Sequence, residues 1–295
     1  MAILIISPKE VYATARLKEE FKKAGLPGIF FDVNDLAVRR FSVKLSKYSG
    51  LYIRQAYPYQ TAVTQLALRF AHSRKPIVDA NIIRATQDSG KWGVYQTLMQ
   101  HGVSIPQTVL LSSQSVSQDD TRAYPYILKW IYGFGGQHVY LIKTKDDAHR
   151  VLQKYPPEQL LVQEFIEAQY EYKVMTVGYN SLPVVLKFKT SGKYFRPDFK
   201  NYKILDCHPE RSEGSLHEIP RQARNDSREE EVIALAERAA RVLGRELAKV
   251  DIIQDAEGEL FILEVNRWPG FQNFEKLTGY NVAGEFVGYL QKKLK

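Results

Sequence analysis

The stretch Ala248–Gly270, AKVDIIQDAEGELFILEVNRWPG, predicts two apolar strands joined by a tight four-residue turn. Short apolar runs on both sides of a turn-forming cluster are typical of a β-hairpin. Side chains alternate between the two faces of a strand, so Glu264 and Asn266 lie on one face. If the hairpin is symmetric about its turn, Asp251 lies opposite Ile262, which shares that face. The hairpin is therefore predicted to bring two carboxylates and one amide to the same surface.

These three side chains, Asp251, Glu264 and Asn266, are the predicted metal ligands. Hard cations such as Mg²⁺ prefer carboxylate and amide oxygens and usually hold nucleotide phosphates as well. Cross-strand spacings of about 5 to 8 Å are too wide for direct hydrogen bonds but suit one or two bridging ions. The alternative is a hairpin with a solvated polar face. We favour the metal site because Glu264 ends an otherwise apolar strand, where an unpaired charge is costly.

Composition places the chain among ordinary globular proteins. Its 295 residues are 44% hydrophobic and 25% charged, which suits two or three domains. The single cysteine, Cys207, cannot form an internal disulfide, and neither a targeting segment nor a run of ~20 apolar residues is evident. A cytoplasmic protein without a membrane partner is expected. The net charge of +8 favours anionic partners, but the basic residues are dispersed, which argues against nucleic-acid binding.

Strand-like and helical patterns alternate through the first part of the chain. The strand-like runs are 2–6, 29–33, 51–53 and 76–78, and the helical runs are 11–23 and 62–71. This alternation predicts a small parallel α/β unit. No Gly-x-Gly-x-x-Gly motif follows the first strand, so NAD binding is not predicted. A further helix over 89–101 ends at Gly102, and a domain boundary is expected near its start.

A glycine-rich turn, Gly133–Gly136, lies between two strand-like runs within 124–142. Glycines let backbone N–H groups approach phosphate oxygens, and Lys129 precedes the turn. The turn is not a Walker loop, because it lacks Gly-Lys-Ser/Thr and leads into a strand. Further on, an apolar strand over 160–165 is followed by Glu167 and Glu171, whose region could hold an adenine edge and ribose hydroxyls. Taken singly, a glycine-rich hairpin turn is the commoner explanation of the first signal, and surface charges are the commoner explanation of Glu164, Glu167 and Glu171.

In this order, the parts resemble the ATP-grasp superfamily, and most closely its RimK-like branch of carboxylate-amine ligases. The resemblance runs from Lys91 to the C-terminus, with a looser match before it. It implies an α/β and α+β chain: an N-terminal parallel pre-ATP-grasp domain (1–88), a lid subdomain (89–168) and a C-terminal subdomain with the metal site (169–295). Its motifs are Lys91, Lys129, the glycine turn, residues 163–171, the metal ligands, and the closing stretch 269–283.

The resemblance also implies roles for individual residues. Lys91 and Lys129 would lie near the phosphates of ATP, residues 164–167 would lie along the adenine, and Glu171 would lie near the ribose. Two Mg²⁺ ions, or Mn²⁺ in their place, would bind the three metal ligands. The implied nucleotide-binding residues are Lys91, Lys129, Gly133, Gly135, Gly136, Gln163, Glu164, Phe165, Ile166, Glu167 and Glu171, and the implied catalytic residues are Lys129, Lys200, Asn201 and Arg267.

The implied reaction is amide-bond formation. In such ligases a substrate carboxylate attacks the γ-phosphate of ATP, and an amine then attacks the acyl phosphate, so no protein nucleophile is needed. The expected substrates are an amino acid or peptide, with glutamate addition as the leading subtype, and a homodimer or homotetramer is expected. An ATP-binding regulatory protein without ligase activity is the alternative. Phosphoryl transfer to a hydroxyl is a third interpretation, which hydroxylamine trapping would separate.

Two features depart from the branch. Arg267 and Trp268 stand where many relatives carry small residues. Arg267 is suited to pair with a substrate carboxylate while Trp268 narrows the pocket, or the arginine stacks on the tryptophan for structural reasons. The second departure is a polar insert over 207–226, which we interpret as a tolerated loop whose deletion preserves folding and ATP turnover. It follows Lys200–Asn201, which fits the basic-Asn position of the branch.

Overall fold

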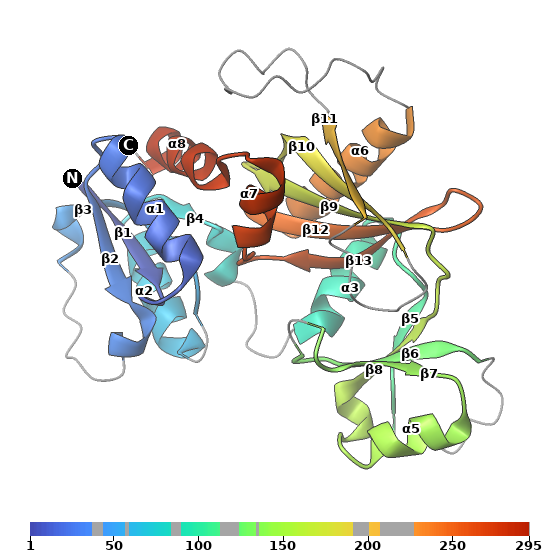
Figure 1. Cartoon of the computed structure of the whole chain (residues 1–295). Coiled ribbons are helices and arrows are strands. Elements are labelled where there is room, and N and C mark those ends of the chain that lie inside the picture. The colour runs from blue at the N-terminus through green and yellow to red at the C-terminus, as the bar shows by residue number, and fades with distance from the viewer. Residues whose placement is uncertain are drawn as a thin grey trace.

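The computed structural model describes residues 1–36, 44–56, 59–83, 90–112, 124–133, 136–190, 201–206 and 227–294, and these residues form three β-sheets with helices packed on them (Figure 1). Lys200, Gly135 and the insert 207–226 lie outside the described residues. Within the described part of the chain, no helix is long and apolar enough to cross a membrane.

The N-terminal sheet is parallel and has the strand order β2-β1-β3-β4. Its strands are β1 (Ala2–Ser7), β2 (Gly28–Asp32), β3 (Tyr48–Ile53) and β4 (Ile77–Val78), and its helices are α1 (Tyr12–Lys23) and α2 (Gln60–His72). The even residues of β1, such as Leu4 and Ile6, pack with α2, while Ile3 and Ile5 face the other core. The parallel α/β prediction for this unit is confirmed. Short 3-10 helices follow at Val33–Leu36, Leu45–Lys47, Ala80–Ile83 and, later, Pro157–Gln159.

The largest sheet is antiparallel, in the order β11-β10-β9-β12-β13. Its strands are β9 (Tyr170–Val177), β10 (Asn180–Lys189), β11 (Tyr202–Asp206), β12 (Leu247–Gln254) and β13 (Leu260–Asn266). Helix α6 (Ser227–Val242) covers one face, where its residues Val232, Ala236 and Ala239 are buried. Helix α3 (Gly90–Gln100) packs against the same core through Leu98.

A smaller antiparallel sheet, in the order β5-β8-β6-β7, carries the glycine-rich turn. Its strands are β5 (Thr108–Leu110), β6 (Tyr126–Trp130), β7 (Val139–Ile142) and β8 (Leu160–Glu164). Helix α5 (Lys145–Leu152) covers it and begins with a capping box, in which Asp147 donates its backbone N–H to the side chain of Thr144. The proposed boundary at 168 falls between this sheet and the largest one, while a boundary at 88 lies outside the described residues.

The end of the chain returns to the N-terminal sheet (Figure 1). Helix α7 (Gln272–Thr278) follows β13, and it ends at Gly279, whose φ of 71° suits glycine. Helix α8 (Val282–Leu294) follows, and in its first turn the Gly284 N–H donates to the side chain of Asn281, which caps the helix. Buried α8 residues share a core with Ile3 and Ile5 and with one face of the largest sheet. This shared core holds the first and last parts of the chain together.

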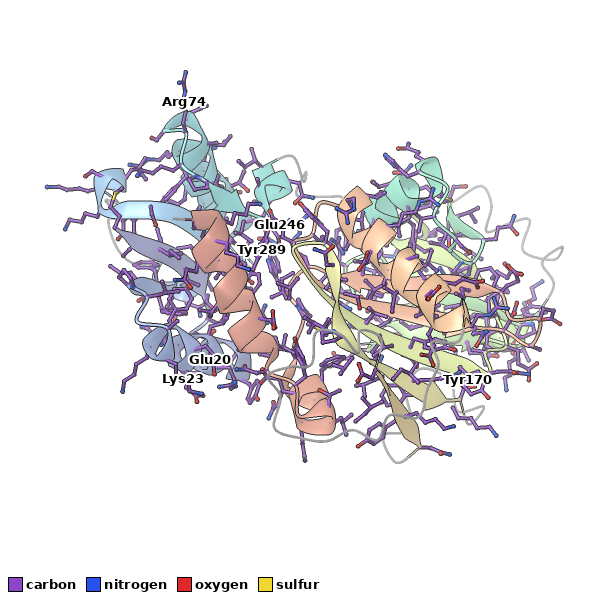
Figure 2. The ribbon with its side chains drawn as sticks, turned by 90° about the horizontal axis from the view of Figure 1, so that it is seen from above. Glu20, Lys23, Arg74, Tyr170, Glu246 and Tyr289 are labelled. Atoms are coloured by element: carbon purple, nitrogen blue, oxygen red, sulfur yellow. The ribbon has the colours of Figure 1, made fainter. Side chains whose placement is uncertain are left out.

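A buried polar network joins the N-terminal unit to the largest sheet. Asp79 donates its backbone N–H to Glu246 Oε1 at 2.9 Å, and Glu246 returns its own N–H to Asp79 Oδ1 at 2.5 Å. The hydroxyl of Tyr289 and the ammonium group of Lys293 both reach Glu246 Oε2, so helix α8 joins the network (Figure 2). The reciprocal pair fixes the start of β12 against the end of β4.

Replacing Asp79 by asparagine is expected to stabilise the protein near neutral pH. Burial raises the pKa of Asp79 from 3.8 to about 6. Because the folded state binds this proton more tightly than the unfolded state, the contribution to stability is complete below pH 3.8 and is lost as the pH rises to about 6. Asparagine cannot ionise, keeps the acceptor for the Glu246 N–H, and tolerates the φ of 57° at this position. The free energy of unfolding should rise by about 1 to 2 kcal/mol at pH 7 and stay unchanged at pH 4.

Urea unfolding at the two pH values measures this effect. Asp146→Asn, at an exposed position at the start of α5, is the matched control and should give no such pH-dependent gain. An Asp79→Asn variant that is less stable at pH 7 would show that the carboxylate charge holds the junction together.

Candidate active site

The hairpin β12–β13 has a different register from the symmetric one predicted. Asp251 lies opposite Glu264, because the register shifts between Asp251 and Ile252 and Leu263 bulges out. Ile262 instead lies opposite Ile252, and both are buried on the face that α6 covers. The expectation that Asp251 faces Ile262 was therefore wrong.

The turn of the hairpin explains part of the difference. It spans five residues, because Asp255 donates its N–H to the carbonyl of Glu259 at 3.1 Å and Glu259 donates its N–H to Asp255 Oδ1 at 2.7 Å. Together, the longer turn and the bulge keep Asp251, Glu264 and Asn266 on one face, as predicted, with Asn266 opposite Lys249.

Charged side chains form a row across three strands of this face. Lys173 of β9, Asp251 of β12 and Glu264 of β13 lie directly opposite one another. Asp251 contacts the ammonium groups of Lys173 and Lys249 at 3.4 Å each. Lys91, at the start of α3, donates to Glu264 Oε1 at 2.8 Å. The face therefore carries carboxylates that are each matched by lysines from neighbouring elements.

Two of these lysines, Lys173 and Lys249, were not predicted as site residues. The alternation in β9 contained the signal, because it places Glu171 and Lys173 on one face, where they form an ion pair at 2.6 Å. Glu171, predicted near the ribose, thus lies beside the row, two residues from Lys173 along β9. Which lysine contacts which carboxylate depends on the strand order of the sheet, and the sequence does not specify it.

The ion pairs change the protonation of the row. Burial opposes the charge of Glu264, but Lys91, Lys249 and Lys129 outweigh it and lower the pKa of Glu264. Burial likewise opposes the charge of Lys173, but Asp251 and Glu171 outweigh it and raise the pKa of Lys173. Both groups are therefore charged at neutral pH, and the Glu264 carboxylate is available as an anionic ligand.

Lys129 reaches this region from β6 in the smaller sheet. It is 7% exposed, and its ammonium group donates to the hydroxyl of Tyr95 at 3.2 Å. That hydroxyl in turn donates to the carbonyl of Leu263 at 2.7 Å, at the bulge of β13. Among the described residues, no carboxylate lies within 4.0 Å of Lys129, and burial lowers the pKa of Lys129 from 10.5 to about 8. A buried cation without a carboxylate partner is suited to bind an anion.

The donor set of the row fits a hard divalent cation. Asp251 Oδ1 is buried and accepts no hydrogen bond, although Lys173 lies at ion-pair distance. With Glu264 and Asn266 it offers carboxylate and amide oxygens, the ligands that Mg²⁺ prefers. Within the described residues, three or more His, Cys, Asp or Glu side chains nowhere cluster as a metal site. A metal on this face would therefore bind the two carboxylates together with the Asn266 amide.

A cavity of about 360 Å³ opens beside Glu264 and Asn266. Five segments of the chain line it: the start of α2, helix α3, the residues after β6, the segment before β12, and the end of β13. The described lining residues are Gln60, Gly90, Lys91, Val94, Tyr95, Leu98, Ile131, Tyr132, Gly133, Arg245, Glu264, Val265, Asn266 and Arg267. Predicted residues Lys91, Gly133, Glu264, Asn266 and Arg267 thus meet at one cavity, and Arg245 joins them unpredicted.

Arg267 and Trp268 point to different partners. Arg267 Nη1 donates to the Asn81 side chain at 2.7 Å, while Trp268 Nε1 donates to the carbonyl of Ile53 at 3.0 Å. Trp268 packs against the core of the N-terminal unit and is outside the described lining of the cavity. The expectation that it narrows the pocket is not met, because its indole anchors the chain to β3.

Several other predicted residues lie outside the described lining of the cavity. Gln163 is buried in the smaller sheet and donates to the Thr108 hydroxyl at 2.8 Å. Glu164 is exposed and donates its N–H to the carbonyl of Gln107 at 2.8 Å. Residues 165–167 form the irregular connection to β9. Asn201 is exposed at the start of β11, the opposite edge of the sheet from β13.

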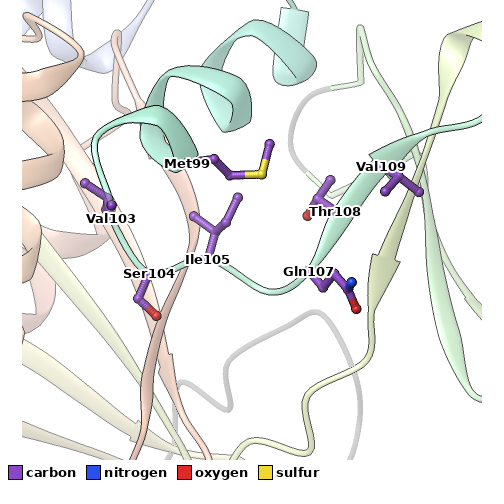
Figure 3. A pocket seen from close by; sticks show the side chains of 8 residues that line it. Met99, Val103, Ser104, Ile105, Gln107, Thr108 and Val109 are labelled. Atoms are coloured by element: carbon purple, nitrogen blue, oxygen red, sulfur yellow. The ribbon is translucent and has the colours of Figure 1, made fainter.

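A second, more open cavity of about 510 Å³ lies where α3 leads into β5 (Figure 3). Met99, Val103, Ile105 and Val109 give it a largely apolar wall, and none of its described lining residues is titratable. Its polar side chains, Ser104, Gln107 and Thr108, are neutral, so its described lining offers no charged group for phosphate or a metal ion. The larger volume therefore does not mark the reactive site.

A model of the ATP-grasp domain matches residues 88–270. This range contains Lys91, Lys129, the glycine-rich turn and the hairpin. The fold and the charged face thus define an ATP-grasp domain preceded by a parallel α/β unit. The chain belongs to the ATP-grasp family, as the sequence resemblance predicted.

Two bacterial relatives carry the name probable alpha-L-glutamate ligase. The protein of Shewanella loihica is 26% identical over an alignment that covers 100% of this chain and 97% of that protein. The protein of Mannheimia succiniciproducens is 30% identical, over 69% of this chain and 64% of that protein. The chain therefore matches less than two thirds of the Mannheimia relative.

Solved structures share the fold at low sequence identity. The ATP-grasp ligase PsnB, in complex with a phosphomimetic variant of its minimal precursor, Mg and ADP, gives a TM-score of 0.70 at 17% identity, covering 99% of this chain and 98% of that chain. A RimK domain protein from Sphaerobacter thermophilus gives 0.65 at 16% identity, covering 98% and 99%. The predicted fold class is confirmed.

Proposed function

We propose that the protein is an ATP- and Mg²⁺-dependent carboxylate-amine ligase. The observation that carries this proposal is the row in which Asp251 and Glu264 lie directly opposite each other, with lysines from three other elements around them. A hard cation and a polyphosphate both fit such a surface. Relatives named glutamate ligase and an ATP-grasp ligase bound to Mg and ADP support the same activity.

The chemistry divides into two transfers. A substrate carboxylate oxygen bonds to the γ-phosphorus of ATP while the bond to ADP breaks, which gives an acyl phosphate. An amine nitrogen then bonds to the acyl carbon, loses a proton, and displaces inorganic phosphate. Both transfers gather negative charge on phosphoryl and carbonyl oxygens, and cations stabilise it.

Each charged group has a task in this scheme. Asp251, Glu264 and Asn266 would hold one or two Mg²⁺ ions, which Mn²⁺ can replace, and the ions would neutralise phosphate oxygens. Lys129 would contact the phosphates from the smaller sheet, and Lys91 would do so from the start of α3, exchanging its contact with Glu264 for a phosphate. The turn that contains Gly133 would close over them. Residues 163–167 and Glu171 remain proposed contacts of the adenosine, and Lys200 and Asn201 remain proposed catalytic residues.

The substrates are proposed to be an amino acid or a peptide, with glutamate as the first choice. The names of the relatives favour glutamate, and the precursor in the PsnB complex favours a peptide. A homo-oligomer is an expectation from the resemblance.

The test is release of ADP and phosphate from Mg-ATP across pairs of amino acids and short acidic peptides. Turnover that requires both a carboxylate and an amine, with a hydroxamate when hydroxylamine replaces the amine, is the expected result. ATP binding without turnover on any pair would favour the regulatory alternative. Turnover with a hydroxyl acceptor and no hydroxamate would favour a kinase-like transfer.

A further inference from the structure

Two arginines in the cavity wall are not matched by carboxylates. Arg245 Nη1 donates to the carbonyl of Val265, and its Nε is buried without a hydrogen bond. Arg267 donates to the amide oxygen of Asn81. In the described part of the chain, neither guanidinium has a carboxylate within 4.0 Å. Both guanidinium groups are half-buried, and among the described residues they bond only to neutral oxygens.

The arginines lie close to each other and to the proposed metal ligands. Arg245 bonds to Val265, the residue before Asn266, and Arg267 follows Asn266 directly. The charge of Arg267 is close enough to disfavour the charge of Arg245. The carboxylate that most favours the charge of both arginines is Asp79, which lies outside ion-pair distance; its Oδ1 accepts the Glu246 N–H and its Oδ2 is buried without a hydrogen bond. Two like charges held together in this way favour an anion between them.

The charged lining of the cavity carries a net positive charge. Its charged lining consists of Lys91, Arg245 and Arg267 against Glu264, which gives three cations and one anion among the described residues. Lys91 is already paired with Glu264, so the excess belongs to the arginines. Gln60 and Gly90 begin α2 and α3, and the positive ends of these helix dipoles face the same space.

We propose that Arg245 and Arg267 bind a free carboxylate of the substrate, a group distinct from the carboxyl or amine that reacts. Guanidinium matches a carboxylate in a planar, two-bond geometry. The substrate is therefore an amino acid or acidic peptide that keeps an unreacted carboxylate beside the reacting centre. This inference rests on the proposed function for the position of that centre, but the anion site itself follows from the arginines.

A structural explanation makes a different prediction. If Arg245 only ties the start of β12 to β13 and Arg267 only ties β13 to the N-terminal unit, then substituting either one should weaken every ligand equally. If they bind a carboxylate, only ligands with that group should be affected. A comparison of an acid with its amide separates the two explanations.

The experiment is calorimetric titration of the full chain, with and without Mg-AMPPNP. The ligands are L-glutamate, L-aspartate and glutamyl-glutamate, each beside the analogues in which one carboxylate is an amide. For the wild type, at least one acid should bind about 10- to 100-fold more tightly than one of its amides. Arg245→Met and Arg267→Lys should remove most of this ratio, while the affinity for Mg-AMPPNP stays within about threefold.

Arg238→Met is the matched control. Arg238 also donates to a backbone carbonyl, that of His101, but it lies outside the described lining of the cavity. It should keep the wild-type ratio of acid to amide. Equal weakening of acid and amide by the Arg245 and Arg267 variants, or no preference of the wild type for any acid, would overturn the inference. Failure of the wild type to bind Mg-AMPPNP would instead contradict the proposed function, and the titration without nucleotide would still test the arginine pair.

Discussion

Replacing Glu264 by alanine is expected to reduce kcat by on the order of 10³-fold, because several kcal/mol of charge stabilisation by the metal would be lost. Glu264 contacts two other predicted site residues: it lies opposite Asp251 and accepts a hydrogen bond from Lys91 at 2.8 Å. The alanine variant would leave a bound cation with one carboxylate instead of two. It would also leave Lys91 without its partner.

Steady-state ADP release at saturating Mg²⁺ measures this loss. Glu264→Gln should reduce kcat almost as much, because an amide keeps the size of the side chain but not its charge. Glu257→Ala removes an exposed carboxylate from the turn of the same hairpin and should retain wild-type kcat. An alanine variant with more than about one tenth of wild-type kcat would contradict a metal-binding role for Glu264. Even substituting residues that only hydrogen-bond to metal ligands typically lowers activity about 10- to 100-fold.

The sequence predicted the face of the hairpin but not its register. The alternation in β13 is a local property, so the shared face of Glu264 and Asn266 could be read directly. The position of Asp251 depends on the bulge at Leu263 and on the five-residue turn, which no residue pattern specified. Asp251 still lies on the predicted face, because the longer turn and the bulge together shift its partner by two residues along β13, from Ile262 to Glu264.

Long-range contacts explain what else was missed. Arg245 stands just before β12 and reaches the cavity only because β12 pairs with β13, so its position depends on sheet pairing. Strand β10 contains Pro183, which lacks a backbone donor and obscures the strand pattern, and the structure accommodates it where the register with β9 shifts. Helix α7 is only seven residues long, too short for a clear helical period.

Replacing Lys129 by methionine is expected to change stability and function in opposite directions. Burial lowers the pKa of Lys129 from 10.5 to about 8. The amine is therefore still protonated at neutral pH, but protonation is less favourable in the folded protein than in the unfolded chain. Between pH 8 and 10.5 the unfolded state binds this proton more tightly, and stability rises with pH through that range. Methionine removes the buried charge and keeps the length of the side chain.

The free energy of unfolding of Lys129→Met should therefore exceed that of the wild type by about 1 to 3 kcal/mol at pH 7, and the difference should shrink by pH 10. The same variant should bind Mg-ATP about 10- to 100-fold more weakly, because a phosphate oxygen loses a charged donor. Urea unfolding at both pH values and nucleotide titration measure the two effects on one preparation. Lys154→Met, at an exposed position in the same part of the chain, should change neither quantity.

The opposite signs give this prediction its strength. If Lys129 served only to stabilise the fold, its removal would lower the free energy of unfolding. Nucleotide binding would then weaken only because less of the protein is correctly folded. If Lys129 instead binds an anion, its buried charge destabilises the protein without ligand, and the bound anion offsets this cost. If Lys129→Met lost stability at pH 7, or gained it while binding Mg-ATP normally, the phosphate-binding role proposed for Lys129 would be wrong.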